Sequence, residues 1–316
     1  MELRGGSIKK RKLTLEEIGR CHPRIRKTGA DTRKEPRQNT GKGKGKGACL
    51  PVSIYQRVTS RTHRQKDRQR NGQRNGQRGR KTGKKESAYS MVGCAEGADH
   101  CLLDHISLSD EKKKALRKQY LRPRRPKEWE KKPDMWLDNY NIQNVMKQYE
   151  ETYSWLHFLG VFPIDFSAPD PYRKNGEVQC LNQELCNLDL HKEYKRGIRG
   201  IAMVFNLDPH YKGGSHWVAL YINLTSIERP VVGYFDSYGY KTPTMISRFM
   251  RSLQLQVKEC VLGYNARRFQ YGGSECGMFS LYFLICMIHG ISFDEFCKDA
   301  LHDRSMLELR SALFSL

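Results

Sequence analysis

Residues 269–279 read FQYGGSECGMF, a stretch in which Gln270 precedes Cys276 by six positions. The two glycines signal a turn and an apolar run follows the cysteine, so we expect Cys276 at the beginning of a buried helix. A thiolate is stabilised at the amino-terminal end of a helix and beside an imidazole. A solitary cysteine is more often a small buried residue, and that interpretation suits Cys180, Cys186, Cys260, Cys286 and Cys297.

Two residues upstream have the chemistry to activate this thiol. His216 follows a Gly-Gly-Ser turn and precedes an expected strand at residues 217–224, and Asp236 follows an expected strand at residues 231–235. If the strands are antiparallel neighbours, the start of one lies beside the end of the other, which brings imidazole and carboxylate together. The carboxylate would then fix the tautomer of the histidine. A structural histidine and a turn aspartate are the simpler alternatives.

Gln270 completes a candidate site for nucleophilic acyl transfer. Its side-chain amide can donate an N–H to the oxygen that becomes negative in a tetrahedral intermediate, and the backbone N–H of Cys276 is the expected second donor. A glutamine before a turn means little alone, so its significance comes from the fixed spacing to the cysteine.

The positive charge of the chain is concentrated at its amino terminus. The 316-residue chain has a formal net charge of +22, and residues 1–90 hold 27 Lys and Arg against 7 Asp and Glu, which leaves +2 for residues 91–316. The basic part contains a GKGKGKG run, a doubled NGQR unit and few apolar residues, so we expect a disordered arm. Such an arm can bind nucleic acid or an acidic protein, or serve as a solubilising or targeting tail.

The sequence also bears on the compartment of the protein. No signal-like apolar stretch is present at the amino terminus, and the longest apolar run, residues 278–288, is too short for a membrane span. We therefore expect neither secretion nor membrane insertion. Ten cysteines without a secretory signal are expected to stay reduced.

No cofactor and no metal is expected. Cys94, His100, Cys101 and His105 lie close together in the sequence, which raises the alternative of a metal site. Their spacing differs from the usual CxxC-based zinc patterns, so the favoured interpretation is the beginning of a helix with incidental ligands.

The pattern of the chain predicts an α+β domain that follows a connector. Residues 91–133 combine a basic helix after Ser109 with a proline-containing extended segment, and residues 134–316 are expected to form the globular domain. Strands are expected at 158–162, 201–206, 217–224, 231–235 and near 257–262. Helices are expected after residue 138, from about 243, over 276–289, from 292 and around 306–314.

At these residues the chain resembles the superfamily of adenovirus-protease-like and Ulp1-like cysteine proteases, whose members carry His, Asp or Asn, Gln and Cys in this order. The resemblance begins near Trp136 and rests on HW at 216–217, FDS at 235–237, and Gln270 with SECG at 274–277. It is strongest to the virion core proteases of nucleocytoplasmic large DNA viruses, such as those of African swine fever virus, iridoviruses and giant viruses. Glu275 replaces the aspartate usual in cellular SUMO proteases, which favours a viral relative.

The resemblance implies a papain-like fold with a central, mostly antiparallel sheet flanked by helices. It implies a cysteine endopeptidase with Cys276 as nucleophile, His216 as base, Asp236 as orienting carboxylate and Gln270 as oxyanion donor, and with Trp217 and Trp136 at the substrate cleft. It further implies cleavage of viral core and capsid precursors after small residues such as Gly-Gly, in the virion core and the host cytoplasm.

Two other functions fit parts of the sequence. A protease that removes SUMO or a related modifier would use the same four residues. A nucleic-acid-binding protein with a catalytically dead protease-like domain is the other alternative, but a decayed enzyme need not retain His, Asp, Gln and Cys together.

Overall fold

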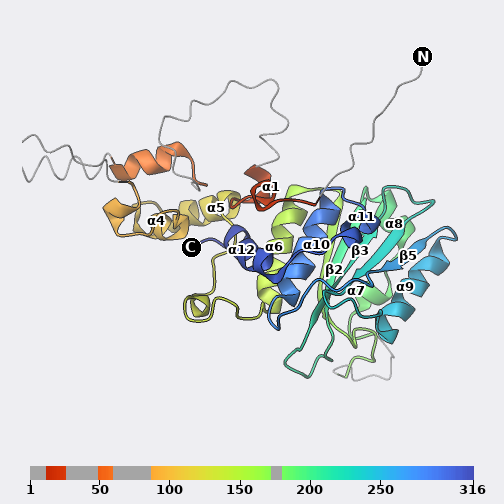
Figure 1. Ribbon diagram of the computed structural model, residues 1–316. Helices are drawn as coiled ribbons and strands as arrows, with labels where there is room; N and C mark the ends of the chain where they lie inside the picture. The colour runs from red at the N-terminus through yellow and green to blue at the C-terminus, as the bar shows by residue number, and fades with distance from the viewer. Residues whose placement is uncertain (1–11, 26–48, 60–86, 172–179) are drawn as a thin grey trace, which may run out of the picture. The chain divides into compact units, whose positions relative to one another are not determined.

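The computed structural model describes residues 12–25, 49–59, 87–171 and 180–316 of the chain (Figure 1). The chain divides into two compact units. The first comprises Met1–Ile18 and Lys127–Arg310, and the second comprises Gly19–Pro126 and Ser311–Leu316.

A five-stranded sheet forms the centre of the first unit, in the order β1-β2-β3-β4-β5. The pairs β2–β3 and β3–β4 are antiparallel, whereas β1–β2 and β4–β5 are parallel because helices connect these strands. The expected α+β class with helices flanking a central sheet is confirmed, although the sheet is mixed and its antiparallel pairings are confined to β2, β3 and β4. The strands are β1 (Leu156–Pro163), β2 (Gly200–Asn206), β3 (Trp217–Asn223), β4 (Val231–Phe235) and β5 (Val261–Tyr264).

Helices cover both faces of this sheet (Figure 1). On one face α10 (Cys276–Ile288) packs against β2 and β3, and α6 (Asn139–Thr152) packs against β1 and α10. On the other face the sheet shares a hydrophobic core with α9 (Thr244–Gln256), α7 (Gln183–Cys186) and α8 (Leu190–Lys195). Because β2 and β3 are buried on both faces, their sequences are almost continuously apolar.

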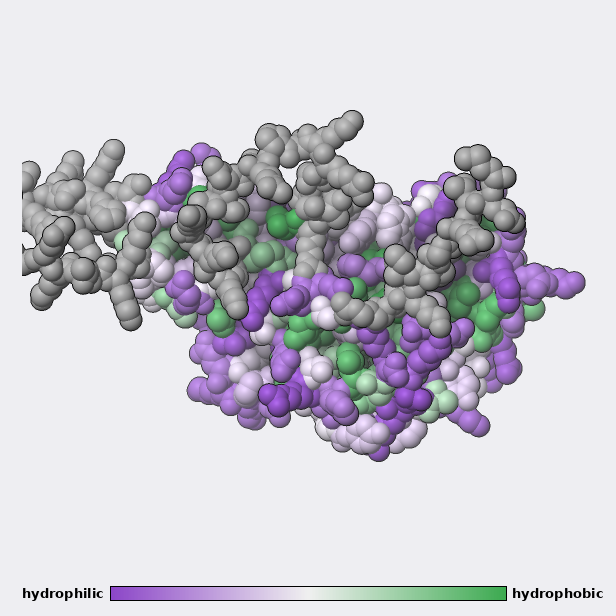
Figure 2. All heavy atoms as spheres, turned by 45° about the horizontal axis from the view of Figure 1, so that its top comes forward, coloured by the Kyte–Doolittle hydropathy of each residue, from purple (hydrophilic) through white to green (hydrophobic). Residues whose placement is uncertain are grey.

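Shorter helices complete the first unit. They are η2 (Lys127–Glu130), α11 (Phe293–Lys298), which Ser292 caps as predicted, and α12 (Asp303–Leu313). The α12 helix begins three residues earlier than expected, and its residues up to 310 belong to this unit. No helix in the described part of the chain is both long and apolar enough to cross a membrane. The face in Figure 2 is largely hydrophilic, with small hydrophobic areas, as expected when both faces of a sheet are covered.

The second unit has its own small hydrophobic core. It contains η1 (Ser90–Val92), α4 (Asp99–His105), α5 (Asp110–Tyr120) and a helical segment at residues 52–59. Ile54 and Val58 lie four residues apart on one face of this helical segment, and both are buried in this core together with Leu50. Ser109 caps α5 as predicted, and this helix ends before Pro123.

This unit changes the expected domain organisation. Residues 49–59 pack in a core, whereas the sequence indicated a disordered arm over 1–90. The prediction missed this segment because its few apolar residues, at positions 50–58, stand in a strongly basic sequence. The rest of that arm, apart from residues 12–25 and 87–90, lies outside the described residues. Residues 91–126 belong to a folded unit, whereas the sequence indicated a connector over 91–133.

Three cysteine pairs form disulfides, which corrects the expectation that all ten cysteines stay reduced. The pairs are Cys21–Cys49, Cys94–Cys101 and Cys180–Cys186. The fold brings their Cα atoms to between 5.3 and 6.5 Å, within bonding reach, which the sequence did not reveal. Cys276 is free, as are Cys260, Cys286 and Cys297.

Candidate active site

Cys276 is the first residue of α10 and is only 2% exposed. The helix is apolar on every side and buried along its whole length, so it holds the sulfur at the positive end of the helix dipole. The loop before the helix is held by Asp303. Its carboxylate accepts hydrogen bonds from the backbone N–H groups of Tyr271 at 3.0 Å and Gly272 at 2.9 Å.

Glu275, the residue before the cysteine, anchors the beginning of α10. Its buried carboxylate accepts two hydrogen bonds of 3.1 Å from Nε and Nη2 of Arg310 in α12. Burial raises the pKa of Glu275, and Arg310 offsets part of this effect. The guanidinium also lies over the ring of Trp129, with 4.6 Å between its carbon and the ring centroid. Two helices distant in sequence are thus joined directly behind the thiol.

His216 and Asp236 lie together at one end of the sheet. His216 precedes β3 and Asp236 follows β4, and the antiparallel register, with Ala219 opposite Phe235, brings these ends side by side. Nε2 of His216 donates a hydrogen bond of 2.8 Å to Oδ1 of Asp236, whose side chain is 1% exposed. The predicted proximity of this pair is confirmed.

Asp236 is held from two further sides. Its backbone N–H donates to Oδ1 of Asn265 at 2.8 Å, and Nδ2 of Asn265 donates to the carbonyl oxygen of Asp236 at 2.7 Å. The backbone N–H of Tyr238 donates to the same Oδ1 that His216 contacts, at 2.8 Å. The carboxylate therefore has little freedom to turn away from the imidazole.

The environment of His216 favours its charged form. Burial alone lowers the pKa of this imidazole, but the hydrogen bonds and negative charges of Asp236 and Cys276 outweigh burial and raise the pKa to about 9. Because Nε2 contacts Asp236, the other ring nitrogen, Nδ1, is the one available to the sulfur. His216 therefore carries a positive charge beside Cys276 at neutral pH.

Gln270 is fully buried and its amide is held in one orientation. Oγ of Ser237 donates to Oε1 of Gln270 at 2.7 Å, and Nε2 donates to the carbonyl oxygen of Gly272 at 2.9 Å and to the hydroxyl of Tyr238 at 3.3 Å. The ring of Tyr238 stacks on His216, with centroids 4.8 Å apart. Tyr238 therefore connects the glutamine with the histidine.

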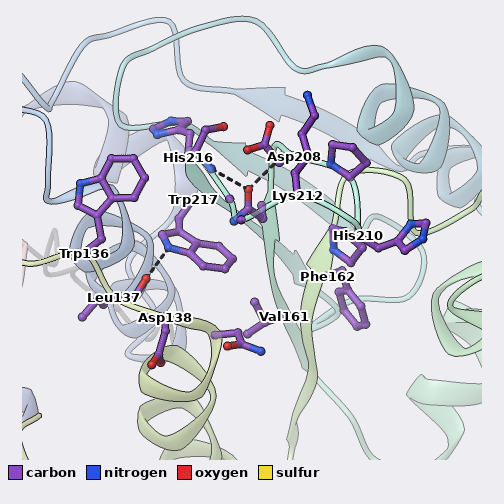
Figure 3. A pocket seen from close by; sticks show the side chains of 17 residues that line it. Trp136, Leu137, Asp138, Val161, Phe162, Asp208, His210, Lys212, His216 and Trp217 are labelled. Atoms are coloured by element: carbon purple, nitrogen blue, oxygen red, sulfur yellow. Dashed lines mark hydrogen bonds between the residues drawn. The ribbon is translucent and has the colours of Figure 1, made fainter.

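A cleft of about 490 Å³ opens beside His216 (Figure 3). Trp136, 45% exposed, and Trp217, 8% exposed, both line it. Nε1 of Trp217 donates to the carbonyl oxygen of Leu137 at 2.8 Å, so the indole is fixed. Cys276 is not among the residues that line this cleft.

Several residues that hold this site were not predicted. Asn265 and Arg310 act through buried side-chain contacts and Asp303 through exposed ones, in each case with another segment of the chain, and no spacing pattern marks them. Tyr238 carried a weak signal, because it is an aromatic residue two positions after the candidate aspartate.

The sequence is similar to known cysteine proteases. The Ulp1 protease family, C-terminal catalytic domain, matches residues 200–315. A protein of Acanthamoeba polyphaga mimivirus, named as a thiol protease, is 28% identical over 227 residues, which cover 69% of each chain. A protein of African swine fever virus, named as a SUMO-1 cysteine protease, is 24% identical over 190 residues, 57% of this chain and 68% of that one.

The fold is also similar to a solved structure. The crystal structure of an African swine fever virus protease superimposes with a TM-score of 0.62 at 17% sequence identity, covering 95% of this chain and 96% of that one. The matched family region contains all four candidate residues, His216, Asp236, Gln270 and Cys276. Residues 200–315 therefore match the catalytic domain of the Ulp1 protease family, and the chain is similar to viral cysteine proteases.

Proposed function

We propose that Cys276 is the nucleophile of this protease, His216 its base and Asp236 the carboxylate that orients the base. The observation that carries this assignment is the 2.8 Å hydrogen bond between His216 and the buried Asp236 at the end of the sheet. Cys276 also contributes to raising the pKa of His216. The sulfur attacks the scissile carbonyl carbon, and His216 then gives its Nδ1 proton to the leaving amine. Water hydrolyses the resulting thioester in the second step.

In this proposal Gln270 and the backbone N–H of Cys276 stabilise the oxyanion. The Gln270 amide is fixed by Ser237, so its N–H groups need little reorganisation during the reaction. The N–H that now contacts Tyr238 at 3.3 Å has the longer of its two hydrogen bonds and is the one more easily shared with substrate.

The proposed substrates are viral structural precursors cleaved after small residues such as Gly-Gly during virion maturation, in the virion core and the host cytoplasm. Support comes from the viral source of the relatives and from the resemblance to virion core proteases. A second candidate is removal of SUMO or a related modifier, because one relative is named as a SUMO-1 cysteine protease.

The first experiment offers Gly-Gly-containing precursor peptides and SUMO or ubiquitin conjugates to the wild-type chain and to Cys276→Ala. Cleavage should fall by at least about a thousandfold in Cys276→Ala, because the nucleophile is removed. Cys297→Ala, at another free cysteine, serves as the matched control and should keep full activity. Retained cleavage by folded Cys276→Ala contradicts the assignment, and preferential cleavage of SUMO conjugates favours the second candidate.

The basic residues 1–90 are proposed to hold the enzyme near nucleic acid or an acidic partner protein. Support comes from the net charge of +20 in this segment. Replacing Lys42, Lys44 and Lys46 with Ser should make DNA affinity less dependent on salt. The slope of log affinity against log salt concentration should become shallower by about 0.9 for each phosphate that the variant no longer neutralises. Unchanged affinity and slope would contradict the role of this run.

A further inference from the structure

The second unit contains a group of two cysteines and a histidine that has no part in the protease site. The sulfur atoms of Cys94 and Cys101 and Nδ1 of His105 all lie within 4.8 Å of one another. Nδ1 is 3.8 Å from Sγ of Cys94 and 3.9 Å from Sγ of Cys101. Within the described ranges, this is the one group of three or more Cys, His, Asp or Glu residues arranged so that it could hold a metal ion.

Local structure brings these three side chains together. Cys101 and His105 are four residues apart in α4, so they lie on the same helix face. Cys94 follows η1, where Gly93 adopts a φ of 74° and turns the chain, and the backbone N–H of Cys94 donates to the carbonyl oxygen of Tyr89 at 2.9 Å. Cys94 is buried, Cys101 is half-buried and His105 is exposed, so one side of the group faces solvent.

The beginning of α4 is fixed by a buried carboxylate. Asp99 accepts hydrogen bonds of 2.7 Å from the hydroxyls of Tyr55 and Tyr89, and one of 3.0 Å from the backbone N–H of Cys49. Tyr89 therefore contacts both the segment that carries Cys94 and the first turn of the helix that carries Cys101. These contacts hold the two segments that carry Cys94 and Cys101 beside each other.

His100 does not belong to the group, although it lies between the same residues in the sequence. Its Nε2 donates to the carbonyl oxygen of Arg122 at 3.0 Å, and its side chain is buried. Burial also lowers the pKa of His100. The sequence alone favoured incidental ligands for all four residues, but the structure brings three of them to one point.

In the structure Cys94 and Cys101 are joined as a disulfide, and in that state neither sulfur is available as a thiolate. A dithiol or phosphine reductant breaks the S–S bond and supplies two electrons, and two protons from solvent complete the two thiols. We infer that the reduced cysteines and His105 bind one Zn²⁺, with release of the two thiol protons, and that oxidation to the disulfide releases the ion. The group is thus a redox-controlled zinc site.

The distances fit this inference. Zinc binds sulfur at about 2.3 Å and nitrogen at about 2.0–2.1 Å, which places tetrahedral ligand atoms roughly 3.5 Å apart. The two S···N distances are close to this value, so only the two sulfurs need to separate after reduction. Nδ1 of His105 must give up its 2.9 Å contact with the carbonyl oxygen of Cys101, which water can replace at this exposed position. Water completes the fourth position.

The chemistry of the protease also favours the reduced state. A cysteine nucleophile works only as a thiol or thiolate, so the enzyme needs conditions in which Cys276 is not oxidised. The same conditions act on the half-buried Cys101 and make the zinc ligands available. The small core of this unit benefits from either form of cross-link, because few apolar residues hold it together.

The test measures zinc in the full chain by elemental analysis, after purification with a phosphine reductant, exposure to Zn²⁺ and desalting. We expect one zinc per chain, and loss of the ion after oxidation with oxidised glutathione. Cobalt in place of zinc should give thiolate-to-metal charge-transfer absorption that disappears in Cys94→Ser. His105→Asn should weaken zinc binding by about tenfold or more, because it removes a ligand rather than an outer partner.

The matched control is the double variant Cys21→Ser with Cys49→Ser, which removes the other disulfide of the same unit. It should still bind one zinc, and far-UV circular dichroism shows that each variant remains folded. The inference fails if the reduced wild-type chain binds much less than one zinc. It also fails if folded Cys94→Ser and His105→Asn bind zinc as tightly as the wild type.

Discussion

At the scale of single residues, the orientation of Gln270 depends on the hydroxyl of Ser237, which donates to Oε1 at 2.7 Å. Without that hydrogen bond the amide can rotate and exchange its oxygen and nitrogen. We expect Ser237→Ala to lower kcat by roughly 10- to 100-fold with little change in KM, a smaller effect than the 10²- to 10³-fold typical for loss of an oxyanion donor. Steady-state kinetics check this result.

Ser252→Ala is the control for this variant. The Ser252 hydroxyl donates to the carbonyl oxygen of Phe249 in α9, away from the site, so both kinetic parameters should be unchanged. An equal change in kcat and KM in Ser237→Ala, or no change, would mean that the hydroxyl does not orient the amide in the transition state.

The charge on His216 predicts a pH dependence. Its pKa is raised to about 9, so the imidazolium persists at neutral pH and is lost as pH rises through that value. Asp236→Asn keeps an oxygen acceptor but removes the negative charge that contributes most to raising the pKa of His216, so this pKa should fall although Cys276 still opposes the effect of burial. The alkaline limb of kcat/KM, and of thiol alkylation by iodoacetamide, should therefore move to lower pH in this variant.

A second histidine–aspartate pair, formed by His210 and Asp165 at an exposed position, provides the comparison. Asp165 accepts a hydrogen bond of 2.7 Å from Nδ1 of His210. Asp165→Asn should leave the alkaline limb where it is in the wild type. A limb that does not move in Asp236→Asn would show that Asp236 does not set the charge of His216.

At the scale of elements, the ion pair between α10 and α12 should matter for stability. Arg310→Ala leaves the carboxylate of Glu275 buried without its partner, which typically costs about 3–5 kcal/mol in free energy of unfolding. Arg304→Ala on the same helix removes a partner of Glu308 at an exposed site and should cost less than about 1 kcal/mol. Urea unfolding measures the cost of each variant. If Arg310→Ala costs no more than Arg304→Ala, the buried pair of Glu275 and Arg310 contributes little to the free energy of unfolding.

Elements with a strong local pattern were predicted well. The amphipathic spacing of Ile142, Val145, Met146 and Tyr149 defines α6, and all four side chains are buried. The apolar strands β2, β3 and β4 and the buried α10 were also predicted to within one residue at most of their ends. These segments are long or completely buried, so their periodicity and composition are unambiguous.

Features that depend on contacts between distant segments could not be predicted. The parallel pairing of β5 with β4 depends on the packing of α9. The residues of β5, Val261–Tyr264, are exposed or half-buried without a clear alternation, so they give no strong strand pattern. The proximity of His216 and Asp236 was predictable because it needs only two neighbouring antiparallel strands. The supports from Asn265 and Arg310 were not, because each comes from another element.

At the scale of the whole molecule, the amino-terminal residues contribute to the catalytic unit. Residues 12–18, which include α1 (Leu15–Ile18), belong to the unit that contains the protease site. The hydroxyl of Tyr282 in α10 donates to the carbonyl oxygen of Leu13 at 2.8 Å. The ammonium of Lys12 lies 4.6 Å from the ring centroids of both Phe269 and Phe296. This amino-terminal segment is thus packed behind Gln270, the neighbour of Phe269.

This buried ammonium predicts how stability depends on pH. Burial lowers the pKa of Lys12 from 10.5 to about 8, so between these values the unfolded chain binds more protons and the free energy of unfolding rises with pH. The cost of burying the charged ammonium of Lys12 is therefore present in full below a pH of about 8 and absent above a pH of about 10.5. Lys12→Met keeps a long side chain between the rings without the charge, so it should stabilise the protein at pH 7 and lose this advantage near pH 10. Lys258→Met, at an exposed position, should change neither value in urea unfolding. If Lys12→Met is no more stable than the wild type at pH 7, the two aromatic rings compensate the charge fully.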